Sequence, residues 1–480
     1  MPTPQVTVAD PAQATEVVEG MARVRAELGV ADGFPAEVLA AAEAAARSTA
    51  RTSGRPDRTD IALVTIDPPG SRDLDQAYGA ERRPGGGYRI WYAIADVTAF
   101  VEPGGTLDAE CHGRGVTLYG PDRREPLHPP VLGEGAASLL PRGDRPALLW
   151  SIDLDGDATP VATRLERAIV RSRAQLTYAN VVADLESAPA AEPLVLLREV
   201  GLLRQAAEAA RGGVSLPLPD QVVEPDGHRH YRLTYRTPLE SEGWNAQISL
   251  LAGLEAARTM IDGGVGLLRM LAPPDDRALA RLRRSATALG AEWPPAGGYP
   301  AFVRSLDPTS ATGAALLVQA ARALRGAGYV GFVGGVVPTD PVHGAVAAPY
   351  AHVTAPLRRL CDRAANEVVL SLLAGEPAPE WAVAELALLP GVMAEADSRA
   401  GTFSRAALDL VEALVLAPSV GERFAATVVD VDHDKAEVQL REPAVVARAR
   451  NGRDCEPGDE VEVVLRAADP LTRRVDLDVV

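Results

Sequence analysis

The feature that most constrains this chain is a turn flanked by aspartates, directly after a short apolar segment. Residues 61–66, Ile-Ala-Leu-Val-Thr-Ile, form a mainly apolar run that is typical of a buried strand. Pro68-Pro69-Gly70 then imposes a turn. Asp67 precedes this turn, and Asp73 and Asp75 follow it. Because side chains two positions apart in an extended segment point the same way, we expect Asp73 and Asp75 on one side, with Asp67 returning to them across the turn.

These three carboxylates fit two interpretations. Carboxylates gathered so closely repel one another and raise each other's pKa unless a cation neutralises them. Hard divalent cations take such oxygen ligands, and two of them a few ångströms apart activate a water and hold both oxygens of an in-line phosphoryl displacement. The alternative is a solvated acidic turn, because aspartate is ordinary turn chemistry. The segment alone does not decide between a metal site and a turn.

The central part of the chain is predicted to be α+β. Strands are predicted for two further apolar runs, residues 88–94 and 148–154. Helices are predicted from apolar periodicity over residues 247–260, 314–324 and 357–373. Together they indicate a body of mixed helices and strands that extends to about Leu416.

Residues 1–57 are predicted to form a small helical unit. Apolar residues at helical spacing mark its first helix: Val17, Val18, Met21, Val24 and Leu28. A second helix is expected from Pro35, a favourable first helical residue, to about Arg47. Two interpretations stay open for this pair. It forms either a helix-turn-helix-like accessory module or a helical hairpin packed on the main body.

The last 60 or so residues have a different sequence pattern, which predicts a small β-barrel. Short strand-like runs separated by turn residues occur at residues 423–431, 436–440, 445–449, 460–465 and 474–479. Such a series fits an OB-fold, which is a common oligonucleotide platform. The alternative is another small β-module. The predicted domains are therefore a helical unit, an α+β body and a barrel, at residues 1–57, 58–417 and 418–480.

The composition narrows the class of protein. The 480 residues are 47% hydrophobic and 24% charged, the balance of a folded globular protein. No apolar stretch reaches the roughly 18 to 20 residues of a membrane span, and the N-terminus lacks a secretory signal. We therefore expect a cytoplasmic protein without membrane contacts. Cys111, Cys361 and Cys455 form no CxxC or Cys/His pattern, so neither a zinc site nor a disulfide framework is expected.

The charge balance argues against a protein that coats nucleic acid nonspecifically. There are 48 basic and 65 acidic residues, and the net charge is −17. Lys435 is the only lysine, so nearly every cation is an arginine, whose planar guanidinium suits phosphate contacts. A site that holds phosphates locally with arginines and metal ions is still compatible with this balance.

Several motifs, in order along the chain, resemble one protein family. The segment from Arg58 to Asp75 resembles the start of the RNB catalytic domain of ribonuclease II and ribonuclease R. Residues 350–359 with Asp362 resemble the family signature H-x-T-S-P-I-R-R-Y-x-D. Shorter matches lie between them, at residues 94–97, 114–115, 118–119, 138–139 and 144–145. The resemblance covers roughly Phe34 to Leu416, and the C-terminal barrel lies in the family's usual place.

The resemblance implies a processive 3′-to-5′ exoribonuclease that hydrolyses RNA to nucleoside 5′-monophosphates with the help of Mg²⁺, for which Mn²⁺ is an expected substitute. It makes Asp67 and Asp73 metal ligands, and Asp75 the ligand on which the chemistry depends most. Gln76 stands where the family pattern has aspartate. As a metal ligand it offers an oxygen but no charge, so we expect weaker binding of a second metal and a raised metal requirement.

The resemblance also implies contacts to RNA. Arg358 would lie beside the scissile phosphate, where a fork of N–H donors stabilises charge in the transition state. Arg359 is its neighbour, and Arg114 lies in a matching motif. Tyr119 would stack on a base near the 3′ end, a contact that does not depend on sequence. His352 is either a core histidine or an RNA contact.

Two further features of the family remain to be placed. The second aromatic of its base clamp has three candidates, Tyr231, Tyr235 and Trp244. Members usually carry two cold-shock barrels before the catalytic domain, and residues 1–57 are too few for them. We therefore expect RNA to approach along the C-terminal barrel and the N-terminal helices.

Three functions stay open. The favoured one is the exoribonuclease, acting as a monomer on the 3′ end of single-stranded or structured RNA. The second is an RNB-fold protein that binds RNA but has weak or lost catalysis because of Gln76. The third is a metal-dependent hydrolase of another phosphate ester.

Overall fold

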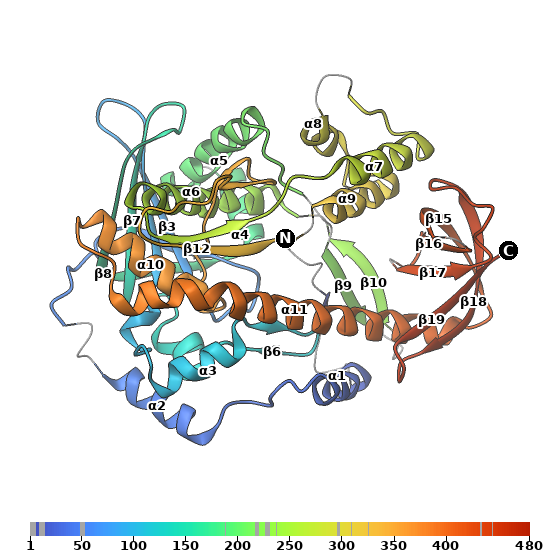
Figure 1. Cartoon of the computed structure of the whole chain (residues 1–480), viewed down its shortest axis with the longest axis horizontal. Coiled ribbons are helices and arrows are strands. Elements are labelled where there is room, and N and C mark those ends of the chain that lie inside the picture. Colours follow the sequence, from blue (N-terminus) through green and yellow to red (C-terminus); the bar gives the residue numbers. More distant parts are fainter. Residues whose placement is uncertain are drawn as a thin grey trace.

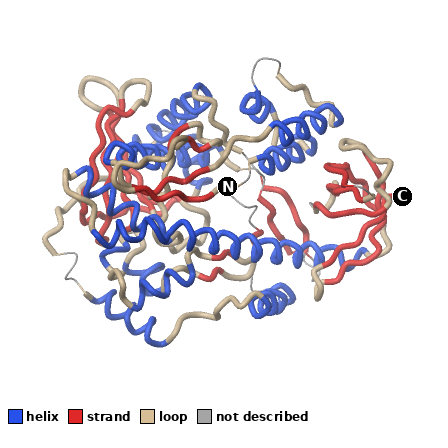
Figure 2. The backbone as a smooth tube through the Cα atoms, viewed as in Figure 1, coloured by secondary structure: helices blue, strands red, loops and turns tan. Residues whose placement is uncertain are grey.

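The computed structural model has two closed strand barrels at opposite ends of the molecule (Figures 1 and 2). A long helix, α11 (Glu380–Leu416), runs across the molecule from beside α10 (Leu360–Leu373) to the second barrel (Figure 1). The structure describes residues 6–8, 15–48, 53–187, 189–216, 220–225, 231–236, 238–294, 298–308, 310–324, 326–432, 434–443 and 445–480.

The first barrel is closed in the order β2–β3–β4–β7–β8, with β2 parallel to β8. These strands span Leu63–Ile66, Gln76–Arg82, Tyr88–Ala95, Asp144–Leu154 and Pro160–Leu176. Side chains of β4 alternate between two buried clusters, with Tyr92 and Ile94 in one and Ala93 and Ala95 in the other. Because both faces are buried, the strand is a continuous apolar run in the sequence. The strands predicted at 88–94 and 148–154 are confirmed as β4 and β7.

Helices pack over this barrel on the side of Tyr92 and form one hydrophobic cluster with it. They are α4 (Tyr178–Glu186), α5 (Glu192–Ala210), α6 (Glu240–Gly263), α10 and α11. The helix predicted at 247–260 lies inside α6, but the predicted start of α10 at Leu357 is wrong. Residues 356–358 form a turn and Arg359 is extended, because the Leu357 N–H donates to Asp75 Oδ1 and the Arg358 carbonyl accepts from the Thr117 N–H. No helix among the described residues is both long and apolar enough to cross a membrane.

The second barrel confirms the predicted OB-type module at the C-terminus. It closes in the order β15–β16–β17–β19–β18. Its strands span Arg423–Asp432, Lys435–Leu440, Val446–Arg450, Glu460–Asp469 and Arg474–Val479. The predicted strand-like runs agree with these strands to within a few residues.

A small helical unit lies between the barrels in Figure 1. It contains α7 (Asp276–Ala288), α8 (Gly298–Ser305) and α9 (Ala311–Ala323), and α9 corresponds to the helix predicted at 314–324. On α9, Gln319 donates to the carbonyl of Val429 and Arg322 ion-pairs with Glu437, so this unit is tied to the C-terminal barrel. The remaining strands are β1 (Val6–Val8), β5 (Leu118–Tyr119), β6 (Arg124–Glu125), β9 (Asp220–Pro225), β10 (Tyr231–Arg236), β11 (Gly266–Met270), β12 (Gly328–Phe332), β13 (Val342–His343) and β14 (Ala348–Pro349).

The two N-terminal helices, α1 (Thr15–Glu27) and α2 (Ala36–Arg47), pack on different parts of the molecule. Met21 and Val24 of α1 belong to a cluster with the end of α11 and the C-terminal barrel, whereas Val38 and Ala42 of α2 belong to a cluster on the first barrel. Because the helices bury their apolar faces separately, they do not form a helix-turn-helix-like unit. The domain boundaries at 57/58 and 417/418 stay predictions.

Candidate active site

Asp67 lies at the end of β2, where closure of the barrel fixes the backbone. The Asp67 N–H donates to the carbonyl of Leu176 at 3.1 Å, directly beyond the parallel β2–β8 ladder. The predicted turn follows, and Gly70 has a φ of +79°, a conformation that glycine adopts without steric cost. The chain therefore leaves the barrel after Asp67 and returns to it at Asp75, immediately before β3.

Ser138 fixes the returning segment. Its Oγ accepts from the Leu74 N–H at 2.9 Å and donates to the Arg72 carbonyl at 2.6 Å. The neighbouring Leu139 N–H donates to the Leu74 carbonyl at 3.0 Å. These bonds hold the backbone on both sides of Asp73 in place.

Asp75 is buried at the centre of the site. It is 4% exposed, and its Oδ1 accepts from the Leu357 N–H at 2.7 Å. Its Oδ2 lies 3.5 Å from Nε of Arg358. Burial raises the pKa of Asp75 to about 8, although the Arg358 guanidinium and the Leu357 N–H oppose that rise. Residues 283 positions apart in the sequence therefore meet as an ion pair.

The other two aspartates differ in their surroundings. Burial raises the pKa of Asp67 to about 6, with the Arg358 guanidinium opposing the rise and Asp73 adding to it. Asp73 instead ion-pairs with Arg124, a residue that the sequence analysis did not single out. Among the described residues, the ligand oxygens of the three aspartates do not all lie within 4.8 Å of one another. The carboxylates share one site but do not form a tight cage.

Arg358 is presented by the turn before α10. The Leu360 N–H donates to the Gly115 carbonyl at 3.0 Å, and the Thr117 N–H donates to the Arg358 carbonyl at 3.0 Å. Gly115 has a φ of +71° and lies so close to Ala396 that a Cβ would be 2.4 Å from the Ala396 Cβ, so glycine is required here. The Arg358 side chain is 46% exposed, which leaves its guanidinium accessible above the buried Asp75.

Tyr119 joins the same site from the β5–β6 hairpin. Burial raises the pKa of its hydroxyl, and the Arg358 guanidinium opposes the rise. The charges of Asp73 and Asp75 also act on this hydroxyl. The structure thus brings Tyr119 together with the aspartates and Arg358.

Gln76 has both ends of its amide engaged. Its Nε2 donates to the carbonyl of Thr354 at 2.5 Å, and its Oε1 accepts from the Tyr92 hydroxyl at 2.9 Å. The side chain therefore links β3 to the segment that carries Arg358. The predicted role of Gln76 as a metal ligand stays a prediction, and in this structure the amide is a structural link.

Three residues that the resemblance assigned to RNA are engaged elsewhere. Arg114 donates to Glu110 at 2.7 Å and to the Gly33 carbonyl, and its guanidinium lies 3.8 Å from the ring centroid of Phe34. Arg359 donates to both carboxylate oxygens of Asp362, at 2.9 and 2.8 Å. His352 Nδ1 lies 2.7 Å from the Tyr329 hydroxyl, and burial lowers its pKa well below the usual value. These contacts are structural, and of the two interpretations of His352 they favour the core histidine.

Of the three candidates for the second aromatic of the expected base clamp, only Trp244 has a described side chain. The side chains of Tyr231 and Tyr235 lie outside the described part of the structure. Trp244 is 5% exposed in the main core, and its Cβ lies 2.6 Å from where Gly201 would carry a Cβ. Trp244 is therefore a packing residue.

Two other groups of metal-type ligands occur among the described residues. In one, His112 lies between Asp108 and Glu385, with its Nε2 2.9 Å from Glu385 Oε2. Arg363 ion-pairs with the same Asp108. The other group is His352, Cys361 and Asp362, whose histidine and carboxylate already bond to Tyr329 and Arg359. Both groups are neutralised by neighbouring cations or donors, so neither competes with the aspartate site.

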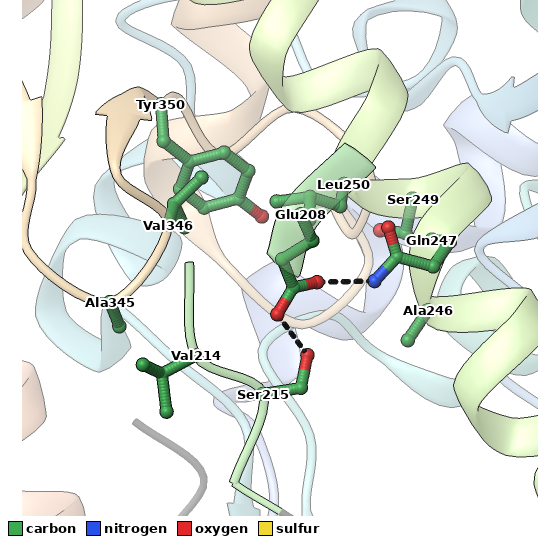
Figure 3. A pocket seen from close by; sticks show the side chains of 10 residues that line it. All are labelled: Glu208, Val214, Ser215, Ala246, Gln247, Ser249, Leu250, Ala345, Val346 and Tyr350. Carbon is green, nitrogen blue, oxygen red and sulfur yellow. Dashed lines mark hydrogen bonds between the residues drawn. The ribbon is translucent and has the colours of Figure 1, made fainter. Parts of the chain in front are cut away.

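A cavity of about 280 Å³ is lined by residues of α5, α6 and the segments around Ser215 and Tyr350 (Figure 3). Glu208 lies in it between Ser215, which donates to it at 2.8 Å, and Gln247, which donates through Nε2. Ser249 lines the same cavity, and its Oγ is 2.9 Å from Oγ1 of Thr354, the residue whose carbonyl holds Gln76. The cavity is thus joined to the aspartate site through two side-chain contacts.

Arg124 and Thr354 are the main site residues that the sequence analysis missed. Arg124 was detectable only as the residue opposite Tyr119 across a tight hairpin, since the two are paired in the β5–β6 register. Thr354 lies in the signature segment 350–359, but its contribution is a backbone carbonyl, which the residue type does not reveal.

A family model described as the RNB domain matches residues 55–375, more than half of the chain. The chain belongs to the RNB-domain family. A second model, the RNase II-type exonuclease C-terminal S1 domain, matches residues 422–480, which form the C-terminal barrel. The RNB domain thus holds the aspartates, Tyr119 and Arg358.

Curated relatives share the RNB segment at moderate identity. Ribonuclease R of Escherichia coli (strain K12) is 29% identical over 340 residues, covering 68% of this chain and 41% of that protein. The exosome complex exonuclease RRP44 homolog A of Arabidopsis thaliana is 28% identical over 323 residues, covering 64% of this chain and 34% of that protein. The chain therefore corresponds to less than half the length of these relatives.

Solved structures share the fold. Mycoplasma genitalium RNase R in complex with ribose-methylated single-stranded RNA superimposes with a TM-score of 0.84 at 17% identity, covering 97% of this chain and 78% of that chain. The same protein in complex with double-stranded RNA gives a TM-score of 0.81 at 18% identity, with 97% and 84% coverage. Yeast Ssd1, described as a pseudonuclease, gives 0.66 at 17% identity, with 86% and 52% coverage. Both RNase R and a pseudonuclease thus share this architecture.

Proposed function

We propose that this protein is a 3′-to-5′ exoribonuclease that hydrolyses RNA to nucleoside 5′-monophosphates. The observation that carries the proposal is the meeting of Asp75 and Arg358 inside an RNB domain. A buried carboxylate and a half-exposed guanidinium at one point combine a cation ligand with a donor for phosphate oxygens. This pairing is what hydrolysis of a phosphodiester requires.

The donor set suits a hard divalent cation such as Mg²⁺ or Mn²⁺, because it consists of carboxylate oxygens. Asp67 and Asp75 are the residues that would hold it, since Asp73 already has a hydrogen-bonded ion pair with Arg124, whereas the contact of Asp75 with Arg358 is longer, at 3.5 Å. When bound, such a cation activates a water and neutralises charge on the phosphate. Asp75 itself is held in orientation by the Leu357 N–H, so it needs no rearrangement to face the site.

The protein groups have separate tasks in this proposal. The Arg358 N–H donors lie where negative charge grows on the phosphate oxygens. Tyr119 provides a ring beside Arg358 on which a base stacks without regard to sequence. The cavity beside Ser249 has room for the terminal nucleoside, and the Glu208 carboxylate in it is an acceptor for ribose hydroxyls. We expect the enzyme to act as a cytoplasmic monomer on RNA 3′ ends.

The test uses a single-stranded RNA labelled at its 5′ end, incubated with the full-length protein and Mg²⁺. We expect stepwise shortening from the 3′ end and release of nucleoside 5′-monophosphates, identified by chromatography. Asp75→Asn should retain RNA binding in a gel-shift assay and release no nucleotide. Inertness toward RNA, with neither binding nor products, would contradict the proposal.

A second candidate is an RNA-binding protein without turnover. Two observations favour it: the amide of Gln76 is fully engaged where the family pattern has a carboxylate, and a pseudonuclease shares the fold. In the same assay this candidate predicts a shifted RNA band and no products at any Mg²⁺ or Mn²⁺ concentration. The two functions are therefore separated by one experiment.

A further inference from the structure

Arg124 is a cation beside the aspartates to which the proposed function assigns no role. Its guanidinium ion-pairs with Asp73, and its Nη2 lies 2.9 Å from Oε1 of Glu134. The Arg124 side chain is only 23% exposed, so it is mostly buried. A carboxylate expected to bind metal therefore already has a cation of the protein beside it.

The β5–β6 hairpin gives Arg124 a fixed direction. Tyr119 and Arg124 are paired directly across the hairpin, so their side chains lie on the same face, toward the aspartates. Leu118 and Glu125 form the adjacent pair and point to the opposite face. The hairpin thus presents one aromatic ring and one cation to the site together.

The opposite face of this hairpin is clamped by α1. Arg25 of α1 donates through Nη1 to Asp122 at 2.8 Å and through Nε to Glu125 at 2.6 Å. All three side chains are 5–6% exposed. Removing one partner of such a buried network leaves uncompensated charge, so the network strongly resists opening. The Arg25 network on the opposite face therefore fixes the hairpin that carries Arg124, and Arg124 does not behave as a mobile surface arginine.

The role of Arg124 follows from the net charge of the side chains at the aspartate site. Asp67, Asp73, Asp75 and Glu134, which shares Arg124 with Asp73, bring four negative charges, and Arg124 and Arg358 bring two positive ones. Two net negative charges remain, and Gln76 adds none. One divalent cation neutralises this cluster, so a second one would meet no net attraction.

We propose that Arg124 takes the place of a second divalent cation at Asp73, so that the aspartate site of this chain binds a single divalent ion. The inference rests on the proposed function, because it describes how the same site balances phosphate charge. It makes Arg124 a permanent positive group of the site. The ion would then be held on the side of Asp67 and Asp75.

The test counts bound Mn²⁺ on the full-length protein without RNA, from the electron paramagnetic resonance signal of free Mn²⁺. Asp75→Asn provides the background of weak binding to other acidic groups. Above that background we expect one Mn²⁺ per wild-type chain. Arg124→Met should gain a second ion, or bind the first at least about tenfold more tightly, because a cation a few ångströms away has been removed. Arg124→Lys keeps the charge and should bind one ion like the wild type.

Arg72→Met is the matched control. Arg72 lies 3.6 Å from the same Glu134 but is 63% exposed, and the change alters the net charge by the same amount. Its Mn²⁺ binding should stay within about threefold of wild type, because exposed charges are screened. Circular dichroism confirms that each variant is folded, and Arg124→Gln replaces the methionine variant if that one unfolds.

Two results overturn the inference while leaving the proposed function intact: two ions on the wild type, or unchanged Mn²⁺ binding in both Arg124→Met and Arg124→Gln. No ion on the wild type above the Asp75→Asn background overturns the inference and removes the metal from the proposed function as well. RNA cleavage measured on the same preparations distinguishes these cases.

Discussion

Arg358 and Arg359 are neighbours in the sequence, yet their guanidinium groups have different partners. Arg358 is 46% exposed over Asp75, whereas Arg359 is bound by both oxygens of the fully buried Asp362. Arg358→Ala should slow RNA cleavage at least about 100-fold, because it removes donors aimed at developing charge. RNA affinity should fall by less than about threefold, since one exposed phosphate contact contributes little. Single-turnover kinetics and filter binding measure the two effects.

Arg359→Ala is the matched control for this prediction. It leaves the buried Asp362 carboxylate without its cation, so we expect a loss of about 3 kcal/mol in the free energy of unfolding. Cleavage per folded molecule should change far less than in Arg358→Ala. If Arg358→Ala instead weakened RNA binding strongly at unchanged turnover, the assignment of Arg358 to the reacting phosphate would be wrong.

The Gln76 side chain links the first barrel to the segment that carries Arg358. Gln76→Glu preserves the shape but cannot donate to the Thr354 carbonyl, so two acceptors would face each other. We expect a loss of about 1 to 3 kcal/mol in the free energy of unfolding when EDTA removes metal. Urea denaturation followed by circular dichroism measures it. Equal stability of variant and wild type in EDTA would show that the amide donor does not contribute.

The helices and strands that could be predicted from the sequence are those determined by residues close to each other in the chain. The runs at 88–94 and 148–154 and the strands of the C-terminal barrel are determined by local apolar patterning, and they were predicted within a few residues. The non-helical residues 357–359 were not, because their backbone is bonded to Asp75 and Thr117, more than 200 positions away. Local helical pattern is overridden there by tertiary hydrogen bonds.

The residues of the candidate site likewise fall into those that the sequence predicts and those that it does not. The Pro-Pro-Gly turn and the order of motifs placed Asp67, Asp73, Asp75 and Arg358 in one site. The partner of Asp73 could not be predicted, because Arg124 reaches it through a hairpin register and a clamp from α1. The assignment of Arg114 and Arg359 to RNA stays a prediction, because a sequence shows their charge but not that Glu110 and Asp362 pair with them.

The contact between α3 (Thr106–Arg114) and α11 should depend on pH. His112 of α3 lies between Asp108 of α3 and Glu385 of α11, and Arg363 of α10 faces the same Asp108. Hydrogen bonds with Asp108 and then Glu385 raise the pKa of His112 to about 10, against the effect of burial. Since the folded-state pKa is raised, the stabilisation is fully present below about pH 6.5 and is lost as the pH rises through about 10.

His112→Gln tests this contact. The variant should be less stable than the wild type by about 1 kcal/mol at pH 6, a modest value because the imidazole is partly exposed. The difference should shrink to nearly zero above pH 10, as measured by urea denaturation across a pH series. His343→Gln is the control, because burial lowers the pKa of His343 to about 4 and its effect should be constant from pH 7 upward. A His112→Gln difference that grew with pH would contradict the ion-pair account.

At the scale of the whole molecule, the C-terminal barrel packs continuously against the rest of the chain. Its core residues, the end of α11 and the apolar face of α1 form one hydrophobic cluster. Gly20 of α1 lies so close to Leu410 of α11 that a Cβ there would be 2.6 Å from Leu410 Cδ2. The ion pair between Glu27 and Arg473 and the contacts of α9 join the barrel to the rest of the chain as well. Such continuous packing predicts that barrel and body unfold together.

Tryptophan fluorescence tests this coupling, because all five tryptophans, the last of them Trp381, lie before the barrel. Leu465→Ala removes a fully buried side chain from the barrel core and should cost about 2 to 5 kcal/mol. If the units unfold together, the fluorescence transition, which reports only the body, should shift to lower temperature as far as the circular dichroism transition does. Leu471→Ala, at a barrel residue that is 70% exposed, should shift neither. An early circular dichroism step in Leu465→Ala with an unchanged fluorescence midpoint would show that the barrel unfolds independently of the body.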